Sequence, residues 1–172
     1  MKVVVVAPHP DDEVIGCWTL LREGVVDEVV FIVSEDLTEK RMEEALASAA
    51  HYKFQLDFLN TRQLVSYLMK QEQNIILAPH YMDHHPLHRS VSSLVYGLSE
   101  AANYTVVYYS TSMNIPGLFK VERWQEKWRD LNEIYPSQKS LWEGDWRYFL
   151  FEGYELASGR HVLKFLKEVK GK

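Results

Sequence analysis

The sequence predicts an α/β fold, a Rossmann-like three-layer arrangement in which helices cover both faces of a mostly parallel sheet. Apolar runs rich in β-branched residues alternate with amphipathic segments along the first two-thirds of the chain. The links between them are short, and strands that alternate with helices in this way usually pair in parallel. We therefore expect the strand order 3-2-1-4-5 within a single domain that spans residues 1–172.

The individual elements follow from hydrophobic periodicity. Continuous apolar or aromatic runs are typical of buried strands. They cover residues 2–6, 25–34, 54–59, 74–79 and 104–109. Apolar or small side chains that recur three and four positions apart, such as Met42, Ala45, Leu46 and Ala49, are typical of one face of a helix. Such segments cover residues 14–24, 38–52, 61–70 and 89–102.

The alternation of strands and helices ends after residue 110. Residues 111–117 are expected to form a loop near the site, and residues 120–134 a helix. Residues 142–154 are rich in aromatic side chains, and their pattern predicts no definite form. Residues 161–172 are amphipathic, which favours a docked surface helix, although a helix that lies on a membrane has the same pattern.

Composition and charge exclude several classes of protein. The formal net charge of −5 argues against a nucleic-acid binder, because such proteins need a basic surface. The only cysteine, Cys17, cannot form an internal disulfide, and the N-terminal apolar run is too short for a signal peptide or a membrane span. We expect a cytoplasmic protein that binds a small molecule. The oligomeric state stays open, a homo-oligomer included.

A first candidate site follows the first strand, where residues 8–13 read Pro-His-Pro-Asp-Asp-Glu. In open α/β sheets, ligands bind at the carboxyl ends of the strands. Asp11 and Asp12 repel each other, and a divalent cation would hold both carboxylates close to His9. An ordinary helix N-cap next to a loop histidine is the alternative interpretation.

A second cluster follows the fourth strand, where four of the seven histidines lie within residues 80–88. In the expected strand order, the first and fourth strands are neighbours and the chain reverses direction between them. Both clusters should therefore meet at this topological switch point. Two imidazoles and one carboxylate form a suitable site for zinc, with positions left open for water and substrate.

Together these motifs resemble the LmbE-like, or PIG-L-type, family of metal-dependent de-N-acetylases. Residues 8–13 match the family's His-Pro-Asp-Asp-Glu segment, and His-Pro-Leu-His at residues 85–88 matches its His-Pro-Asp-His, with leucine in place of aspartate. Ser-Gln at 137–138 and Phe-Glu at 151–152 extend the match over most of the chain. The resemblance implies a zinc-dependent hydrolase that removes the acetyl group from an N-acetylated amino sugar or glycoconjugate of the N-acetylglucosamine type.

The resemblance also implies roles for individual residues. His9, Asp12 and His88 are the expected metal ligands, with Zn²⁺ as the expected ion and Fe²⁺ as an alternative. Asp11, next to a ligand, is the expected general base. His85 is expected to stabilise the oxyanion or to protonate the leaving amine.

Two further residues are candidates for substrate binding. Arg41 and Glu44 match the family's Arg-x-x-Glu, in which the arginine resembles a group that contacts substrate. A surface ion pair between the two residues is the alternative interpretation. Glu13 is expected either to contact substrate or to cap a helix.

The sequence also departs from the family pattern. Trp18 and Thr19 replace two glycines, which predicts a more crowded floor near the site. Leu87 removes the carboxylate that pairs with the catalytic imidazole. We therefore expect a lower pKa for His85 than for its family counterparts, unless Asp83 supplies the missing charge. The loops look short, so the substrate cannot be predicted within its class.

Two other functions stay open. A protein that binds metal but has little or no turnover would act as a binding protein, since Leu87 and the short loops could remove activity. A non-haem iron oxygenase also uses two histidines and one carboxylate. Its sites usually have one residue between the first histidine and the acid, whereas two residues intervene here. Metal analysis and an assay for acetate release separate these functions.

Overall fold

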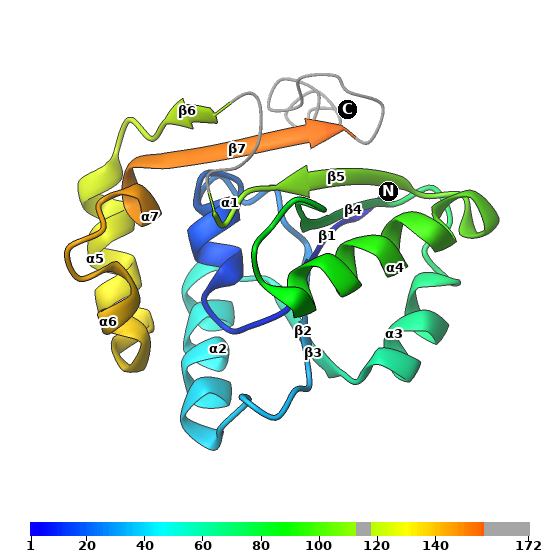
Figure 1. Ribbon diagram of the computed structural model, residues 1–172, viewed down its shortest axis with the longest axis horizontal. Helices are drawn as coiled ribbons and strands as arrows, with labels where there is room; N and C mark the ends of the chain where they lie inside the picture. Colours follow the sequence, from blue (N-terminus) through cyan, green and yellow to red (C-terminus); the bar gives the residue numbers. More distant parts are fainter. Residues whose placement is uncertain (113–117, 157–172) are drawn as a thin grey trace.

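The computed structural model describes residues 1–112 and 118–156, and the strands of this part form one sheet (Figure 1). The strands are β1 (Val3–Ala7), β2 (Glu28–Ile32), β3 (Gln55–Leu59), β4 (Ile75–Pro79), β5 (Thr105–Tyr109), β6 (Leu118–Lys120) and β7 (Phe151–Leu156). Their order is β3-β2-β1-β4-β5-β7-β6. The first five are parallel, which confirms the predicted order 3-2-1-4-5. β7 and β6 extend the sheet with antiparallel pairing.

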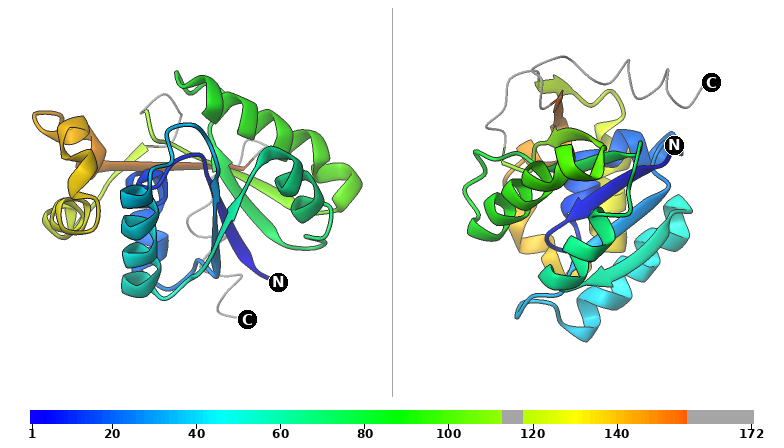
Figure 2. Two further views of the ribbon diagram at one scale, coloured as in Figure 1. Left: turned by 90° about the horizontal axis from the view of Figure 1, so that it is seen from below. Right: turned by 90° about the vertical axis from the view of Figure 1, so that its right-hand side faces the viewer.

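Helices cover both faces of the sheet, as predicted (Figure 2). The helices are α1 (Asp12–Arg22), α2 (Glu39–Tyr52), α3 (Thr61–Leu68), α4 (Pro86–Ala102), α5 (Trp124–Ile134), α6 (Lys139–Trp142) and α7 (Arg147–Leu150), with a 3₁₀ turn at Pro136–Gln138. Side chains of α3 and α4 pack in one apolar cluster, and those of α1, α2 and α5 in the other. No helix in the described ranges is long and apolar enough to cross a membrane.

Two of the expected helices begin at clearly different residues in the structure. The helix predicted for residues 120–134 begins at Trp124, because residues 118–120 pair with residues 151–153 as strands. The fourth expected helix begins at Pro86, where proline suits the first helical position and the His85 side chain accepts the N–H of Leu87 as an N-cap. The expected surface helix at 161–172, and most of the expected loop at 111–117, lie outside the described residues.

The run of valines in β1 follows from its central position. Val3 and Val5 pack in one apolar cluster, whereas Val4 and Val6 pack in the other. Successive side chains of a strand point to opposite faces of the sheet, so a strand with helices on both sides is apolar throughout. This burial holds the end of β1, and the acidic turn after it, in a fixed place.

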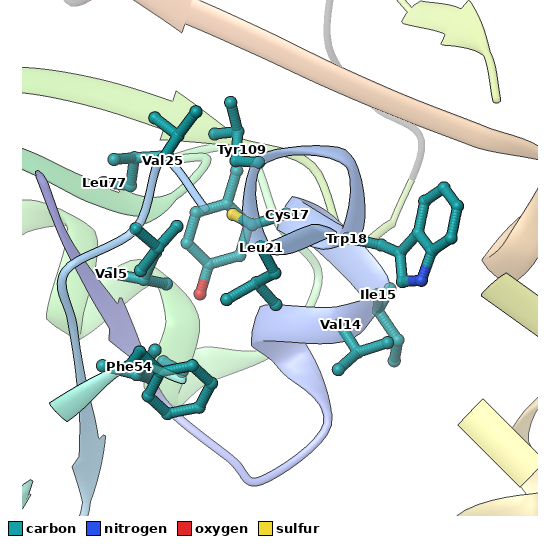
Figure 3. Packing of buried hydrophobic residues seen from close by; sticks show 14 of the residues in the cluster. Val5, Val14, Ile15, Cys17, Trp18, Leu21, Val25, Phe54, Leu77 and Tyr109 are labelled. Atoms are coloured by element: carbon teal, nitrogen blue, oxygen red, sulfur yellow. The ribbon is translucent and has the colours of Figure 1, made fainter. Parts of the chain in front are cut away.

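Close packing between α1 and β5 positions the acidic turn further. The Tyr109 ring lies against α1, and a Cβ atom at Gly16 would come within 2.2 Å of it (Figure 3). The Tyr109 hydroxyl donates a hydrogen bond to the carbonyl of Val6 over 3.0 Å. Only glycine at position 16 permits this approach, which brings the start of α1 close to the sheet.

A buried ion pair lies beside a bend in α1. Cys17 has non-helical backbone angles, φ −131° and ψ 18°. The N–H of Thr19 donates to the carboxylate of Glu152 over 3.2 Å, and the carbonyl of Ile15 accepts from Lys127 Nζ over 2.6 Å. Lys127 and Glu152 pair with each other over 2.9 Å, and neither side chain is exposed. The pair therefore satisfies a backbone donor and a backbone acceptor on either side of the bend.

Candidate metal centre

The two clusters found in the sequence meet at one edge of the sheet. β1 and β4 are hydrogen-bonded neighbours, so the turn after β1 lies beside the loop after β4 (Figure 1). The first turn of α1 carries Asp12, and the first turn of α4 carries His88. The first turns of α1 and α4 thus bring a carboxylate and an imidazole to the switch point.

Three potential ligand atoms form a compact triangle. His9 Nδ1 lies 3.1 Å from His88 Nε2, and Asp12 Oδ2 lies 3.3 Å and 3.2 Å from these two nitrogens. Zinc binds nitrogen and oxygen at about 2.0–2.2 Å, so tetrahedral ligands lie roughly 3.3–3.6 Å apart. The triangle is close to this size. The fold therefore brings together the three residues that the sequence predicts as ligands.

The structure adds His85 as a fourth candidate ligand. Nitrogen atoms of His9, His85 and His88 lie within 4.8 Å of one another. The His85 and His9 rings meet edge to face, with 4.7 Å between their centroids. His85 Nδ1 accepts the backbone N–H of Leu87 over 3.2 Å, which favours the tautomer with its proton on Nε2.

The charges of His88 and Asp12 in the triangle compensate each other. Burial lowers the pKa of His88, but Asp12 and Asp83 raise it more strongly, to about 10. Burial raises the pKa of Asp12, but His88 and His9 shift it well below its ordinary value. Without metal, His88 is therefore protonated and Asp12 is ionised at neutral pH. A divalent cation can replace this proton as the positive charge.

Asp11 lies beside the triangle in a strained backbone conformation. Its φ of 117° is rare for a residue other than glycine, and Glu13 Oε2 accepts its N–H over 3.1 Å. Its buried Oδ2 has no hydrogen-bond partner among the described residues. Burial and the charge of Asp12 raise the pKa of Asp11 well above its ordinary range. Such a carboxylate is suited to accept a proton.

Arg41 reaches the same region from α2. Its Nη2 atom donates to the carbonyl of Pro10 over 3.2 Å and lies 3.7 Å from Asp11 Oδ2. The alternative interpretation was a surface ion pair between Arg41 and Glu44. The Glu44 carboxylate instead accepts both the N–H and the hydroxyl of Ser137. The Arg-x-x-Glu and Ser-Gln elements therefore meet at this contact.

Glu13 does not line the pocket, and the expectation that it contacts substrate is not met by this geometry. Its side chain is 0% exposed and accepts hydrogen bonds from the hydroxyls of Ser48 and Tyr135 as well as from the Asp11 N–H. Burial raises its pKa to about 7 even though these bonds oppose the shift. Glu13 instead supports the backbone of Asp11. Its partners are distant in the sequence, so no local pattern predicts this role.

The substitutions at Trp18 and Thr19 do not crowd the site. Trp18 points away from Tyr109, and its Nε1 donates to Asp130 of α5 over 2.8 Å (Figure 3). Neither Trp18 nor Thr19 lines the pocket, so the expectation of a crowded floor is wrong.

With leucine at position 87, no carboxylate among the described residues forms an ion pair or hydrogen bond with the His85 ring. Asp83 Oδ1 accepts the backbone N–H of His85 over 2.8 Å, while Asp83 Oδ2 lies 3.2 Å from Nδ1 of His88. Burial, and the neighbouring His9 and His88, lower the pKa of His85. Asp12 and Asp83 oppose this shift, and the comparison of His85 with its family counterparts stays a prediction.

A pocket of about 540 Å³ opens at the triangle. It also contacts Asp11, Arg41 and His85. Its other walls include Ile15, Asp36, His84, Pro86, Ser112, Gln138, Leu141 and Tyr148. The part of the chain after β5 therefore contributes polar and apolar surface to one side of the site.

Solved structures of similar fold are deacetylases. The zinc-inhibited form of teicoplanin deacetylase Orf2 has a TM-score of 0.62 and 10% sequence identity, covering 91% of this chain and 99% of that one. The A40926 pseudoaglycone deacetylase Dbv21 has a TM-score of 0.59 and 12% identity, covering 84% and 85%. A deacetylase–bog complex from teicoplanin biosynthesis has a TM-score of 0.58 and 11% identity, covering 84% and 88%.

No family model and no curated protein matches the sequence. The structural likeness extends over most of each chain, although the sequences are only 10–12% identical. This protein therefore has the fold of the teicoplanin-type deacetylases, and its resemblance to the LmbE-like, or PIG-L-type, de-N-acetylases is confirmed at the level of the fold.

Proposed function

We propose that this protein is a metal-dependent hydrolase that removes an acetyl group from an N-acetylated amino sugar or glycoconjugate. The observation that carries this proposal is the triangle of His9, Asp12 and His88, with Asp11 Oδ2 beside it, which is buried and has no hydrogen-bond partner among the described residues. The deacetylases of similar fold support the reaction class. The N-acetylglucosamine type of substrate rests on the family resemblance.

His9, Asp12 and His88 would hold one divalent ion, because the distances between their ligand atoms are close to those of tetrahedral coordination. Such an ion polarises an amide carbonyl and lowers the pKa of water. The two-nitrogen, one-oxygen set suits zinc, and Fe²⁺ is the alternative. Zinc inhibits the teicoplanin deacetylase of similar fold, so several metals should be compared.

The chain's own groups divide the proton transfers. Asp11 takes a proton from the attacking water, because its Oδ2 is buried and has no hydrogen-bond donor in the described structure, and it passes this proton to the amine nitrogen when the C–N bond of the amide breaks. His85 donates from Nε2 to the oxygen of the acetyl carbonyl as negative charge develops there. Arg41 lines the pocket next to Asp11 and contacts the sugar.

The test is acetate release from a panel of N-acetylated amino sugars and glycopeptides, with enzyme that has been stripped of metal and reloaded with single metals. We expect release that requires a divalent metal and fails in Asp11→Asn. Metal uptake without acetate release from any substrate would contradict the proposal and favour a binding protein. Oxygen consumption with Fe²⁺ would favour an oxygenase.

The ligand assignment makes a separate prediction. Metal Kd should rise by at least about 100-fold in Asp12→Asn and His88→Ala, because each removes one corner of the triangle. In His85→Ala the rise should stay below about 10-fold. Competition with a chromophoric chelator measures all three. Equal losses in His85→Ala and Asp12→Asn would place His85 among the ligands.

Leu87→Asp should move the alkaline limb of kcat/KM to higher pH by about one unit. The imidazolium form of His85 is the stronger donor, and it is lost as the pH rises through the pKa of His85, which burial and the neighbouring His9 and His88 lower from its ordinary value. A carboxylate near Nδ1 favours that form and raises the pKa. Leu87→Asn is the matched control, because it adds a polar group of the same shape without charge. If the alkaline limb of kcat/KM does not move in Leu87→Asp, the loss of the His85 proton is not what sets this limb.

A further inference from the structure

We propose that Asp83 is a positioning residue: together with Thr111 it orients the His88 imidazole so that Nε2 faces the metal site. The proposal rests on the metal centre of the proposed function but does not require a particular substrate. It gives a role to an acid of the histidine-rich loop that the motifs leave without one.

The contacts of Asp83 account for both of its oxygens. Oδ2 accepts the Thr111 hydroxyl over 2.6 Å and lies 3.2 Å from His88 Nδ1, and Oδ1 accepts the N–H of His85 over 2.8 Å. The Thr111 hydroxyl itself lies 3.2 Å from the same His88 nitrogen. Asp83 is 4% exposed. The carboxylate therefore joins the end of β5 to the start of α4.

The loop backbone holds Asp83 in this place. The Asp83 N–H donates to the carbonyl of His80 over 3.0 Å, and the Asp83 carbonyl accepts from Arg89 Nη1 over 2.9 Å. Arg89 also donates to the carbonyl of His84. Because both backbone groups of Asp83 are held, the side chain has little freedom to leave the His88 ring.

This arrangement decides which His88 nitrogen is free. Nδ1 faces acceptors, so its proton is kept there when a metal ion replaces the proton on Nε2, and the lone pair of Nε2 is then directed at the metal site beside His9 and Asp12. A carboxylate behind a ligating histidine fixes the ring and makes the ligand nitrogen a better donor of electrons, and its loss usually costs 10–100-fold in metal affinity. The Asp83 carboxylate thus lies behind Nδ1 of His88, whereas Nδ1 of His85 faces the backbone N–H of Leu87.

The experiment titrates metal-free protein with Zn²⁺ or Co²⁺ in competition with a chelator. Asp83→Asn should raise the metal Kd by about 10–100-fold, and Thr111→Val by a smaller factor of about 3–10. Thr111→Ser, which keeps the hydroxyl, should restore the affinity of the parent. Asp36→Asn removes an exposed acid of the same pocket, so its metal Kd should change by less than about threefold.

Circular dichroism and the Co²⁺ absorption spectrum show whether each variant folds and keeps its coordination geometry. If Asp83→Asn does not fold, Thr111→Val against Thr111→Ser decides the matter. Parent-like metal affinity in Asp83→Asn, or in Thr111→Val, would overturn the proposal. So would an equal loss in Asp36→Asn, which would indicate a general effect of charge. A parent that binds metal without releasing acetate contradicts the proposed function and leaves this test in force.

Discussion

Asp11→Asn should lower kcat for acetate release by about 10²–10⁴-fold while the protein keeps its metal. The carboxylate oxygen that would accept the proton is buried and has no donor among the described residues. Burial and Asp12 raise its pKa, which makes it a stronger base than an exposed aspartate. The amide of asparagine has nearly the same shape as the carboxylate and does not accept a proton near neutral pH. Steady-state kinetics and metal content, measured on the same preparation, test this prediction.

Asparagine is the right replacement because Asp11 has a φ of 117°. Asparagine tolerates positive φ better than most residues, so the backbone should keep its form. Asp57→Asn, in the edge strand β3, is the matched control and should keep the kcat of the parent. Parent-like turnover in Asp11→Asn would mean that the general base lies elsewhere. Loss of metal in that variant would make Asp11 a ligand.

Lys127→Met should lower the free energy of unfolding by about 3–5 kcal/mol. The substitution leaves the carboxylate of Glu152 buried without its cation and removes the donor to the Ile15 carbonyl. Urea denaturation of the metal-free protein measures the change. Lys139→Met is the control, because that lysine forms an exposed ion pair with Glu143 among the described residues, and its loss should cost less than about 1 kcal/mol.

The double variant Lys127→Met/Glu152→Met separates charge from backbone satisfaction. It removes the unpaired carboxylate, so part of the lost stability should return. The Thr19 N–H and the Ile15 carbonyl would still lack their present partners, at a cost of about 1–3 kcal/mol each. Full recovery would mean that the ion pair does not support the bend in α1.

Local pattern determined the parallel half of this fold. The all-valine run of β1 is apolar on both faces because helices cover both, and this pattern needs no partner to be recognised. A helix between each pair of successive strands then favours parallel pairing, which places the turn of residues 8–13 beside the loop of residues 80–88. The meeting of these two clusters could therefore be predicted from the sequence, whereas the choice of His9, Asp12 and His88 as ligands rested on the family resemblance.

Tertiary structure alone decided what each polar side chain contacts. β6 and β7 are strands because segments about thirty residues apart pair with each other, and neither has a pattern strong enough to predict it. Glu13 turned out to hold Asp11, and Asp83 to contact His88 instead of the His85 ring, since the positions of Tyr135 and Thr111 depend on distant elements. Hydrophobic periodicity records which face of an element is buried. The partner of a buried polar group depends on directions set by long-range packing, which the sequence does not express locally.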